Sequence, residues 1–239
     1  MDKYEIVKRI EKFAPLETQE DWDCSGWLVD ISGYNEISKI MLCLTVNDSV
    51  IKQAKEQNCD MIISHHPLFS INCHFERQLD RCVSEPVVPQ INVYCAHTNM
   101  DLAKGGTTDT LIKTLGLEVK EVDNFVRYVD IDITVEDFAK RLRKISPNMR
   151  YVNNNDTKEL HRIAFCAGSG SEFINVAFEN GADAFVTGDL KFHTALESPI
   201  VIFDIGHFES EIMVLEVFKN LVGSGIEVVF AKEKSPFIY

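Results

Sequence analysis

Histidines and carboxylates follow three separate apolar segments of this 239-residue chain. The segments end in "ISHHPL", "AHTNMD" and "DIGHFESE". The residues that could do chemistry there are His65, His66, His97, Asp101, His207 and Glu211. Imidazole nitrogens and carboxylate oxygens, without thiolates, are donors suited to Zn, Fe, Mn, Co or Ni. The residue types therefore predict a divalent metal site and leave the identity of the metal open.

The spacing of these residues favours two cations over one. His97 and Asp101 are four residues apart, as are His207 and Glu211. On a helical turn such pairs share one face and can bracket an ion. His65 and His66 are adjacent, so in an extended chain their side chains point to opposite sides and suit two ions. A carboxylate such as Glu211 could bridge ions ~3.5–4 Å apart, as in catalytic two-metal sites.

Each of these features also has a purely structural interpretation. A single histidine at a strand end is most often a hydrogen-bonded structural residue, and a histidine–carboxylate pair on a helix is usually a solvated face. Three such features, each directly after an apolar segment, are harder to explain by coincidence. Ligands of open α/β sheets bind beyond the carboxyl ends of the strands, where remote segments meet. A shared metal site is therefore the favoured hypothesis.

Strands and helices alternate along the sequence, which predicts an α/β protein. We expect strands near 39–46, 60–66, 90–97, 160–166, 182–187, 199–205 and 226–231. We expect helices near 4–13, 49–59, 75–85, 106–116, 135–145, 172–181 and 209–222. Asp48 or Ser49 is expected to cap the second helix, and Gly116 to close the fourth. The pattern of apolar and polar residues changes around residue 124. We therefore predict two lobes, 1–124 and 125–239, with mostly parallel sheets flanked by helices.

The overall composition is that of a soluble globular protein. Lys and Arg number 24 against 37 Asp and Glu, a formal charge of −13. This charge argues against a protein that tracks nucleic-acid phosphates. The seven cysteines lack a C-x-x-C pair, which fits reduced thiols in a cytosolic protein. We find no signal peptide and no apolar run of ~18 residues, so we expect a cytoplasmic protein without a membrane span.

Two further motifs have more than one interpretation. The loop "CAGSGS" (166–171) precedes an expected helix, so its N–H groups could receive a phosphate; a tight turn that needs glycine explains it equally well. His193, in "TGDLKFH", follows a fourth strand end. A structural role and a contact with substrate or metal ligands are both open for this residue.

The motifs "DWDCSGWLVD", "ISHHPL", "AHTNMD", "CAGSGS", "VTGDLKFH" and "DIGHFESE" resemble, in this order, the Nif-three-like family. Bacterial members of that family are labelled GTP cyclohydrolase I type 2 homologues. The resemblance runs from about residue 14 to residue 239 and matches a short form of the family. Cys24 is a departure, since the family more often has asparagine there.

The resemblance implies two divalent cations per subunit between two α/β lobes. It assigns the ligands to His65, His66, Asp101, His207 and Glu211, and it puts His97 in the same pocket. It also implies a toroidal homohexamer. The implied activity is hydrolytic opening of the guanine imidazole ring of GTP, with release of formate. His97 and His193 would then move protons.

A different class of function remains open beside the hydrolase. The chain could be a non-catalytic metal-binding regulatory or interaction protein, or a metal chaperone, that acts as a ring-shaped oligomer. Single-stranded nucleic acid in the ring is disfavoured by the charge of −13, because such binding needs a positively charged groove.

Overall fold

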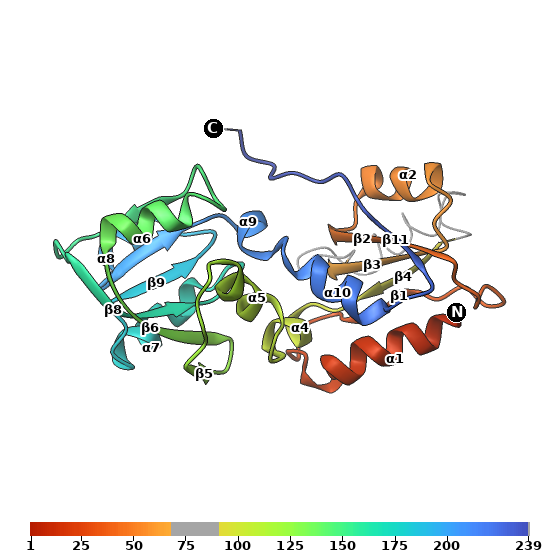
Figure 1. Cartoon of the computed structure of the whole chain (residues 1–239), viewed down its shortest axis with the longest axis horizontal. Helices are drawn as coiled ribbons and strands as arrows, with labels where there is room; N and C mark the ends of the chain where they lie inside the picture. Colours follow the sequence, from red (N-terminus) through yellow and green to blue (C-terminus); the bar gives the residue numbers. More distant parts are fainter. Residues whose placement is uncertain (68–90, 239) are drawn as a thin grey trace. The chain divides into compact units, whose positions relative to one another are not determined.

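A computed structural model describes residues 1–67 and 91–238 of the chain. The chain divides into two compact units. Unit 1 contains residues 1–103 and 214–234, and unit 2 contains residues 104–213 and 235–239. Figure 1 traces the chain through both units by colour. No helix in the described ranges is both long and apolar enough to cross a membrane.

Unit 1 is built on a five-stranded sheet with the order β1-β4-β3-β2-β11. Its strands are β1 (Gly26–Val29), β2 (Lys39–Thr45), β3 (Met61–His66), β4 (Asn92–Cys95) and β11 (Glu227–Phe230). Its helices are α1 (Lys3–Phe13), η1 (Leu16–Thr18), α2 (Asp48–Glu56), α4 (Thr98–Leu102) and α10 (Val214–Val222). All neighbouring strands are parallel except β1, which runs antiparallel to β4. The predicted parallel α/β arrangement is therefore confirmed for this unit.

Alternating side chains of the central strands pack against helices on both faces of this sheet. Met41 and Cys43 of β2 share a buried cluster with Val50 and Ala54 of α2. Figure 1 shows α2 over one face, and α1 and α10 over the other. The helix α2 is capped by Asn47, whose side chain accepts a hydrogen bond from the Val50 amide at 3.0 Å. The prediction that Asp48 or Ser49 caps this helix is wrong, because both residues lie inside the first turn.

Unit 2 contains a six-stranded sheet with the order β5-β6-β8-β9-β10-β7. Its strands are β5 (Glu121–Asp123), β6 (Val126–Thr134), β7 (Arg150–Val152), β8 (Glu159–Phe165), β9 (Ala184–Thr187) and β10 (Val201–Asp204). Its helices are α5 (Thr107–Thr114), α6 (Val135–Leu142), η2 (Ser171–Phe173), α7 (Ile174–Glu179), α8 (Phe192–Glu197) and α9 (His207–Glu211). Gly116 follows α5 with φ +69°, as expected for a glycine that closes a helix.

The second sheet is mixed, which corrects the prediction of mostly parallel sheets. Among the described strands of this sheet, only the β8–β9 and β9–β10 pairs are parallel. The pairs β5–β6, β6–β8 and β10–β7 are antiparallel. Apolar and polar residues alternate in β6, which is typical of an antiparallel strand. A short connection at Asn124 (φ +51°) pairs β6 directly with β5. Buried residues lie on both faces of this sheet, including Phe138 and Phe203 on one and Phe185 and Ile202 on the other.

The units do not follow the expected boundary at residue 124. Leu111 and Ile112 of α5 belong to the core of unit 2, so that unit begins before residue 124. Strand β11 pairs in parallel with β2, which returns the chain to unit 1. The single helix expected over 209–222 is two helices, α9 in unit 2 and α10 in unit 1. The helix expected over 75–85 lies outside the described residues.

Asp60 ties the start of β2 to the loop before β3. Its Oδ2 accepts hydrogen bonds from the Ser38 amide (2.8 Å), the Ser38 hydroxyl (2.6 Å) and the Lys39 amide (3.0 Å). Partial burial raises the pKa of Asp60, but these hydrogen bonds outweigh burial and lower that pKa below its usual value.

We expect Asp60→Ala to lower the free energy of unfolding by about 1–2 kcal/mol at pH 7, because the two amides lose their acceptor. A carboxyl with a lowered pKa in the folded state stabilises above its unfolded pKa, and this contribution is lost as pH falls through the folded pKa. Urea unfolding at pH 7 and pH 3 measures both effects. The gap between the variant and the unmodified protein should narrow at pH 3; a constant gap would contradict the assignment.

Candidate metal-binding residues

The three histidines of unit 1 form one cluster at the carboxyl ends of β3 and β4. His65 and His66 are the last residues of β3, and His97 is the N-cap residue of α4, just after β4. Their ring centroids are 4.9 to 5.5 Å apart. One nitrogen from each ring lies within 4.8 Å of the other two, so this group could hold a metal ion.

Each ring in this cluster is fixed through its Nδ1 atom. His65 Nδ1 lies 3.0 Å from the carbonyl oxygen of Ala96, so it carries the proton and donates. His66 Nδ1 lies 2.7 Å from the hydroxyl of Thr45 on β2. His97 Nδ1 lies 2.9 Å from a carboxylate oxygen of Asp23. With Nδ1 engaged in all three rings, Nε2 is the atom through which each ring would bind a cation.

His65 and Asp101 give a direct test of whether a cation fits here. His65 is fully buried, and its Nε2 lies 3.3 Å from Oδ1 of Asp101 on α4. With the proton on Nδ1, the Nε2 lone pair faces a carboxylate oxygen, and two acceptors at this distance repel each other. A cation held by both atoms, or a second proton on the ring, removes that repulsion. The donor set therefore fits a divalent metal.

Asp23 supports the histidine cluster through a hydrogen bond with His97, and it was not predicted as a functional residue from the sequence. Its carboxylate is 1% exposed and accepts hydrogen bonds from His97, Cys24 and Ser25, and from both the amide and the hydroxyl of Thr98. Burial raises the pKa of Asp23, but the hydrogen bonds and the charge of His97 hold that pKa well below its usual range. The only sequence signal was an aspartate within "DWDCSGW", which also describes a surface turn.

The expected geometry of the adjacent histidines is partly wrong. Their Nδ1 atoms do turn to different strands, His65 towards the residue after β4 and His66 towards β2. The donor atoms nevertheless lie within 4.8 Å of each other. The strand ends at His66 and is followed by Pro67, so the alternation of a regular strand does not hold the two rings apart.

In unit 2, His207 and Glu211 form the predicted pair on one face of a helix. Both lie on α9, which follows β10, and His207 Nε2 is 3.0 Å from Oε2 of Glu211. His207 Nδ1 is 2.7 Å from Oδ2 of Asp189, which follows β9. Burial lowers the pKa of His207, but the hydrogen bonds and charges of Asp189 and Glu211 outweigh it and raise that pKa to about 10. The Nδ1 pattern of unit 1 is repeated here, as in metal-binding histidines oriented by an outer carboxylate.

Two glycines, Gly168 and Gly188, leave the space that Glu211 and His207 occupy. An added Cβ at Gly168 would lie 2.2 Å from Oε1 of Glu211, and one at Gly188 would lie 2.7 Å from the backbone nitrogen of His207. Gly168 also adopts φ +67°. Its amide donates to the hydroxyl of Ser210 at 2.9 Å, which joins the "CAGSGS" loop to α9. Asp189, Gly168 and Ser210 therefore position the pair and were not predicted to do so.

The amides of the "CAGSGS" loop are largely engaged within the protein. Ala167 N donates to Thr108 at 3.1 Å, and Gly170 N donates to Thr187 at 2.9 Å. These bonds favour the interpretation of the loop as a tight structural turn over that of a phosphate site. His193 lies exposed on α8, where its ring contacts Phe192 at 5.4 Å between centroids. Among the described residues it belongs to no group that could hold a metal, and its catalytic role stays a prediction.

We expect Asp189→Asn to weaken metal binding about 10- to 100-fold, because the carboxylate no longer fixes the ring of His207. Asp189 has φ +54°, a conformation that asparagine tolerates well, so the fold should survive. Chelator competition measures the affinity. The matched control is Asp132→Asn, since Asp132 makes the same kind of contact with His161 at 2.6 Å on an exposed surface. Equal affinities for the two variants would argue against a positioning role for Asp189.

Two sheets flanked by helices, with imidazole and carboxylate donors after parallel strands, define this chain as an α/β protein with candidate metal ligands at its strand ends. The family Duf34/NIF3 (NGG1p interacting factor 3) matches residues 1–236. A Campylobacter jejuni protein named GTP cyclohydrolase 1 type 2 homolog is 33% identical over 245 residues, with 98% of each chain covered. A Clostridium perfringens protein of the same name is 34% identical over 258 residues, with 98% of this chain and 97% of its own covered.

This chain therefore belongs to the Duf34/NIF3 family, which confirms the resemblance seen in its motifs. The fold is also similar to a solved structure of reduced HcgD from Methanocaldococcus jannaschii. That structure has a TM-score of 0.81 and 26% sequence identity, and 98% of each chain is covered. The similarity confirms the mixed α/β fold with two sheets.

Proposed function

We propose that this chain binds two divalent metal cations and acts as a metal-dependent hydrolase on a nucleotide. The proposed ligands are His65, His66, Asp101, His207 and Glu211. One observation carries the proposal: each of the four histidines near these strand ends has its Nδ1 atom hydrogen-bonded to the protein, as in metal-binding histidines that bind through Nε2.

Nitrogen and oxygen donors suit Zn, Fe, Mn, Co or Ni. When bound, such cations supply Lewis acidity, which activates water and polarises the bond under attack. The names of the relatives support GTP as the substrate, with opening of the imidazole ring and release of formate. Ring opening and formate release consume two water molecules, one for each C–N bond broken at C8.

His97 is the proposed proton carrier for these two steps. Asp23 accepts a hydrogen bond from Nδ1–H of His97 at 2.9 Å, so Nε2 can accept a proton from the attacking water and return it to the leaving ring nitrogen. The His97 side chain is 20% exposed, which gives it access to solvent. His193 is a second proposed carrier, supported by its exposure on α8.

The proposal is tested by incubating metal-loaded protein with GTP and assaying formate. We expect release by the unmodified protein and by a His161→Ala control, and none above background with His66→Ala. If metal is bound but the unmodified protein releases no formate, GTP is removed as the substrate. The metal-binding regulatory or metal-chaperone alternative would then be favoured.

We further propose that the chain acts as a homohexamer, as its family resemblance implies. Exposed apolar residues on α8 support self-association: Phe192 is 74% exposed and Leu196 is 62% exposed, four residues apart. Sedimentation equilibrium measures the mass. A 27.2 kDa species at all concentrations would contradict the proposal.

A further inference from the structure

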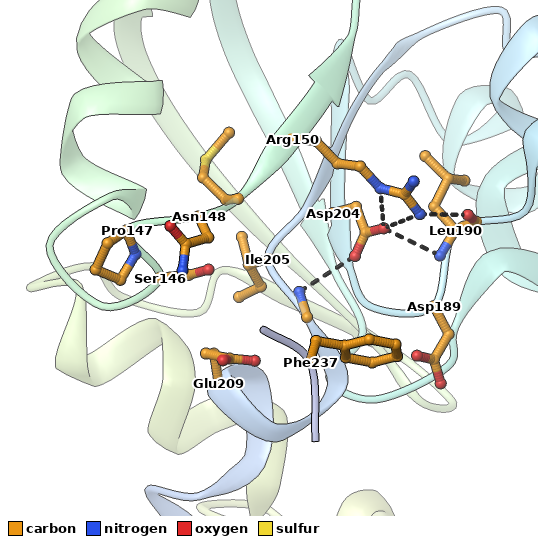
Figure 2. Close-up of a pocket in the computed structure, with 12 residues that line it drawn as sticks. Ser146, Pro147, Asn148, Arg150, Asp189, Leu190, Asp204, Ile205, Glu209 and Phe237 are labelled. Atoms are coloured by element: carbon orange, nitrogen blue, oxygen red, sulfur yellow. Dashed lines mark hydrogen bonds and ion pairs between the residues drawn. The ribbon is translucent and has the colours of Figure 1, made fainter. Parts of the chain in front are cut away.

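Unit 2 contains a cavity of about 400 Å³ at the carboxyl ends of β9 and β10 (Figure 2). The volume lies within the ~300–1,000 Å³ typical of small-molecule sites. The cavity is lined by the loop after α6, by residues that follow β9 and β10, and by Phe237. The position agrees with the rule that ligands of α/β sheets bind beyond the strand ends.

The polar groups on one wall of the cavity, Arg150 and Asp204, already have hydrogen-bond partners within the protein. The Arg150 guanidinium donates to Oδ2 of Asp204 at 2.8 Å and to the carbonyl oxygen of Leu190 at 2.8 Å. The other oxygen of Asp204 accepts from the Gly206 amide at 3.2 Å. Asp204 is 7% exposed, so this ion pair is partly buried and its two charges offset each other. Arg150 and Asp204 therefore shape the wall and leave no net charge for a ligand.

The opposite side of the cavity is acidic and aromatic. In Figure 2 the side chains of Glu209, Phe237 and Asp189 follow one another along the lower side of the view. Within the described part of the chain, no hydrogen bond or ion pair engages the Glu209 carboxylate. That carboxylate lies over Gly206, where an added Cβ would be 2.3 Å from Oε2, so the glycine at φ +85° permits its position. Phe237 is 61% exposed.

This combination selects one class of ligand. An exposed ring face stacks on a flat heteroaromatic ring. A carboxylate accepts two parallel N–H bonds from an amidine-like edge. Guanine carries such an edge in N1–H and its 2-amino group, whereas adenine presents an acceptor beside its amino group. Among the described lining residues, the one cation, Arg150, is paired with Asp204, and Asp189 and Glu209 add negative charge, which disfavours a phosphate as the group bound here.

We propose that this cavity is a base-binding subsite for guanine, with stacking on Phe237 and edge recognition by Glu209. The inference rests on the proposed function, since it supplies the subsite that would hold the base of a nucleotide substrate. It adds a specificity-determining carboxylate, Glu209, which lies within "DIGHFESE" but was not among the predicted site residues, and an aromatic residue outside the motifs.

The test measures binding of guanosine to the full chain by isothermal titration calorimetry. It uses both the unmodified protein and the Asp101→Ala, Glu211→Ala double variant, so that binding is scored without metal or turnover. We expect guanosine to bind both proteins. Inosine, which lacks the 2-amino group, should bind about tenfold more weakly, and adenosine more weakly still. Agmatine, an alkyl guanidinium, should not compete, because it lacks a ring to stack.

Two variants separate the roles of the side chains. Glu209→Gln should lower guanosine affinity about tenfold and reduce the preference over inosine. Phe237→Ala should lower the affinity for guanosine and inosine equally, about tenfold. Phe178→Ala and Glu216→Gln change exposed residues elsewhere and should bind as the unmodified protein does. Equal binding of guanosine and adenosine, displacement by agmatine, or unchanged affinity in Glu209→Gln would overturn the proposal. Guanosine binding without formate release from GTP would retain the subsite and reject the proposed activity.

Discussion

The double variant Asp101→Ala, Glu211→Ala should lose the bound metal, falling from about two ions per chain to near zero. Asp101 faces the Nε2 atom of His65 at 3.3 Å, and Glu211 faces that of His207 at 3.0 Å. Removing both carboxylates leaves only neutral nitrogen donors, which bind a dication more weakly than a set that includes anionic oxygens. Elemental analysis of purified protein measures the effect directly.

The matched control for this loss is Asp132→Ala with Glu118→Ala. Both control carboxylates are highly exposed, with side-chain accessibilities of 91% and 86%. The control removes the same two negative charges from the chain, so a change in overall charge cannot explain a difference in metal content. Circular dichroism establishes that each variant is folded. If the Asp101/Glu211 variant is folded and still holds two ions, the assigned ligands are wrong.

Gly188→Ala should displace His207 and weaken metal binding at least about tenfold. The added Cβ would lie 2.7 Å from the backbone nitrogen of His207, 2.8 Å from the carbonyl carbon of Gly206 and 2.9 Å from Cα of His207. All three atoms are backbone, so no side chain can rotate away and the start of α9 must move. We also expect the free energy of unfolding to fall by about 1–3 kcal/mol, as for other overpacked positions.

Gly181→Ala is the control for this variant. Gly181 has φ +78°, and an added Cβ there meets nothing within 4 Å. The control should lose about 1–2 kcal/mol through left-handed backbone strain and keep its metal affinity. Chelator competition and urea unfolding together separate a general loss of stability from displacement of His207. Equal metal affinities in the two variants would show that Gly188 does not position this histidine.

The local pattern of apolar and polar residues was sufficient to predict most of the helices and strands. Helix α1 occupies 3–13 where helical spacing predicted 4–13, and the apolar run at 39–46 is strand β2. The edge strands β1 and β7 carried no clear pattern, because they are short and their partners are remote in sequence. The mixed second sheet was not predicted, since the direction of a strand depends on which strand it pairs with. That choice is made by the packed core rather than by the segment itself.

The sequence by itself determined which side chains could bind a metal and which strand ends carry them. It also placed His207 and Glu211 on one helical face, because helical periodicity is a local property. Only the tertiary structure decided the orientation of each imidazole ring. Asp23 lies 74 residues before His97, and Asp189 lies 18 before His207, so no spacing rule connects these partners. Orientation of an imidazole depends on the acceptor beside its Nδ1 atom, and packing brings that acceptor from another part of the chain.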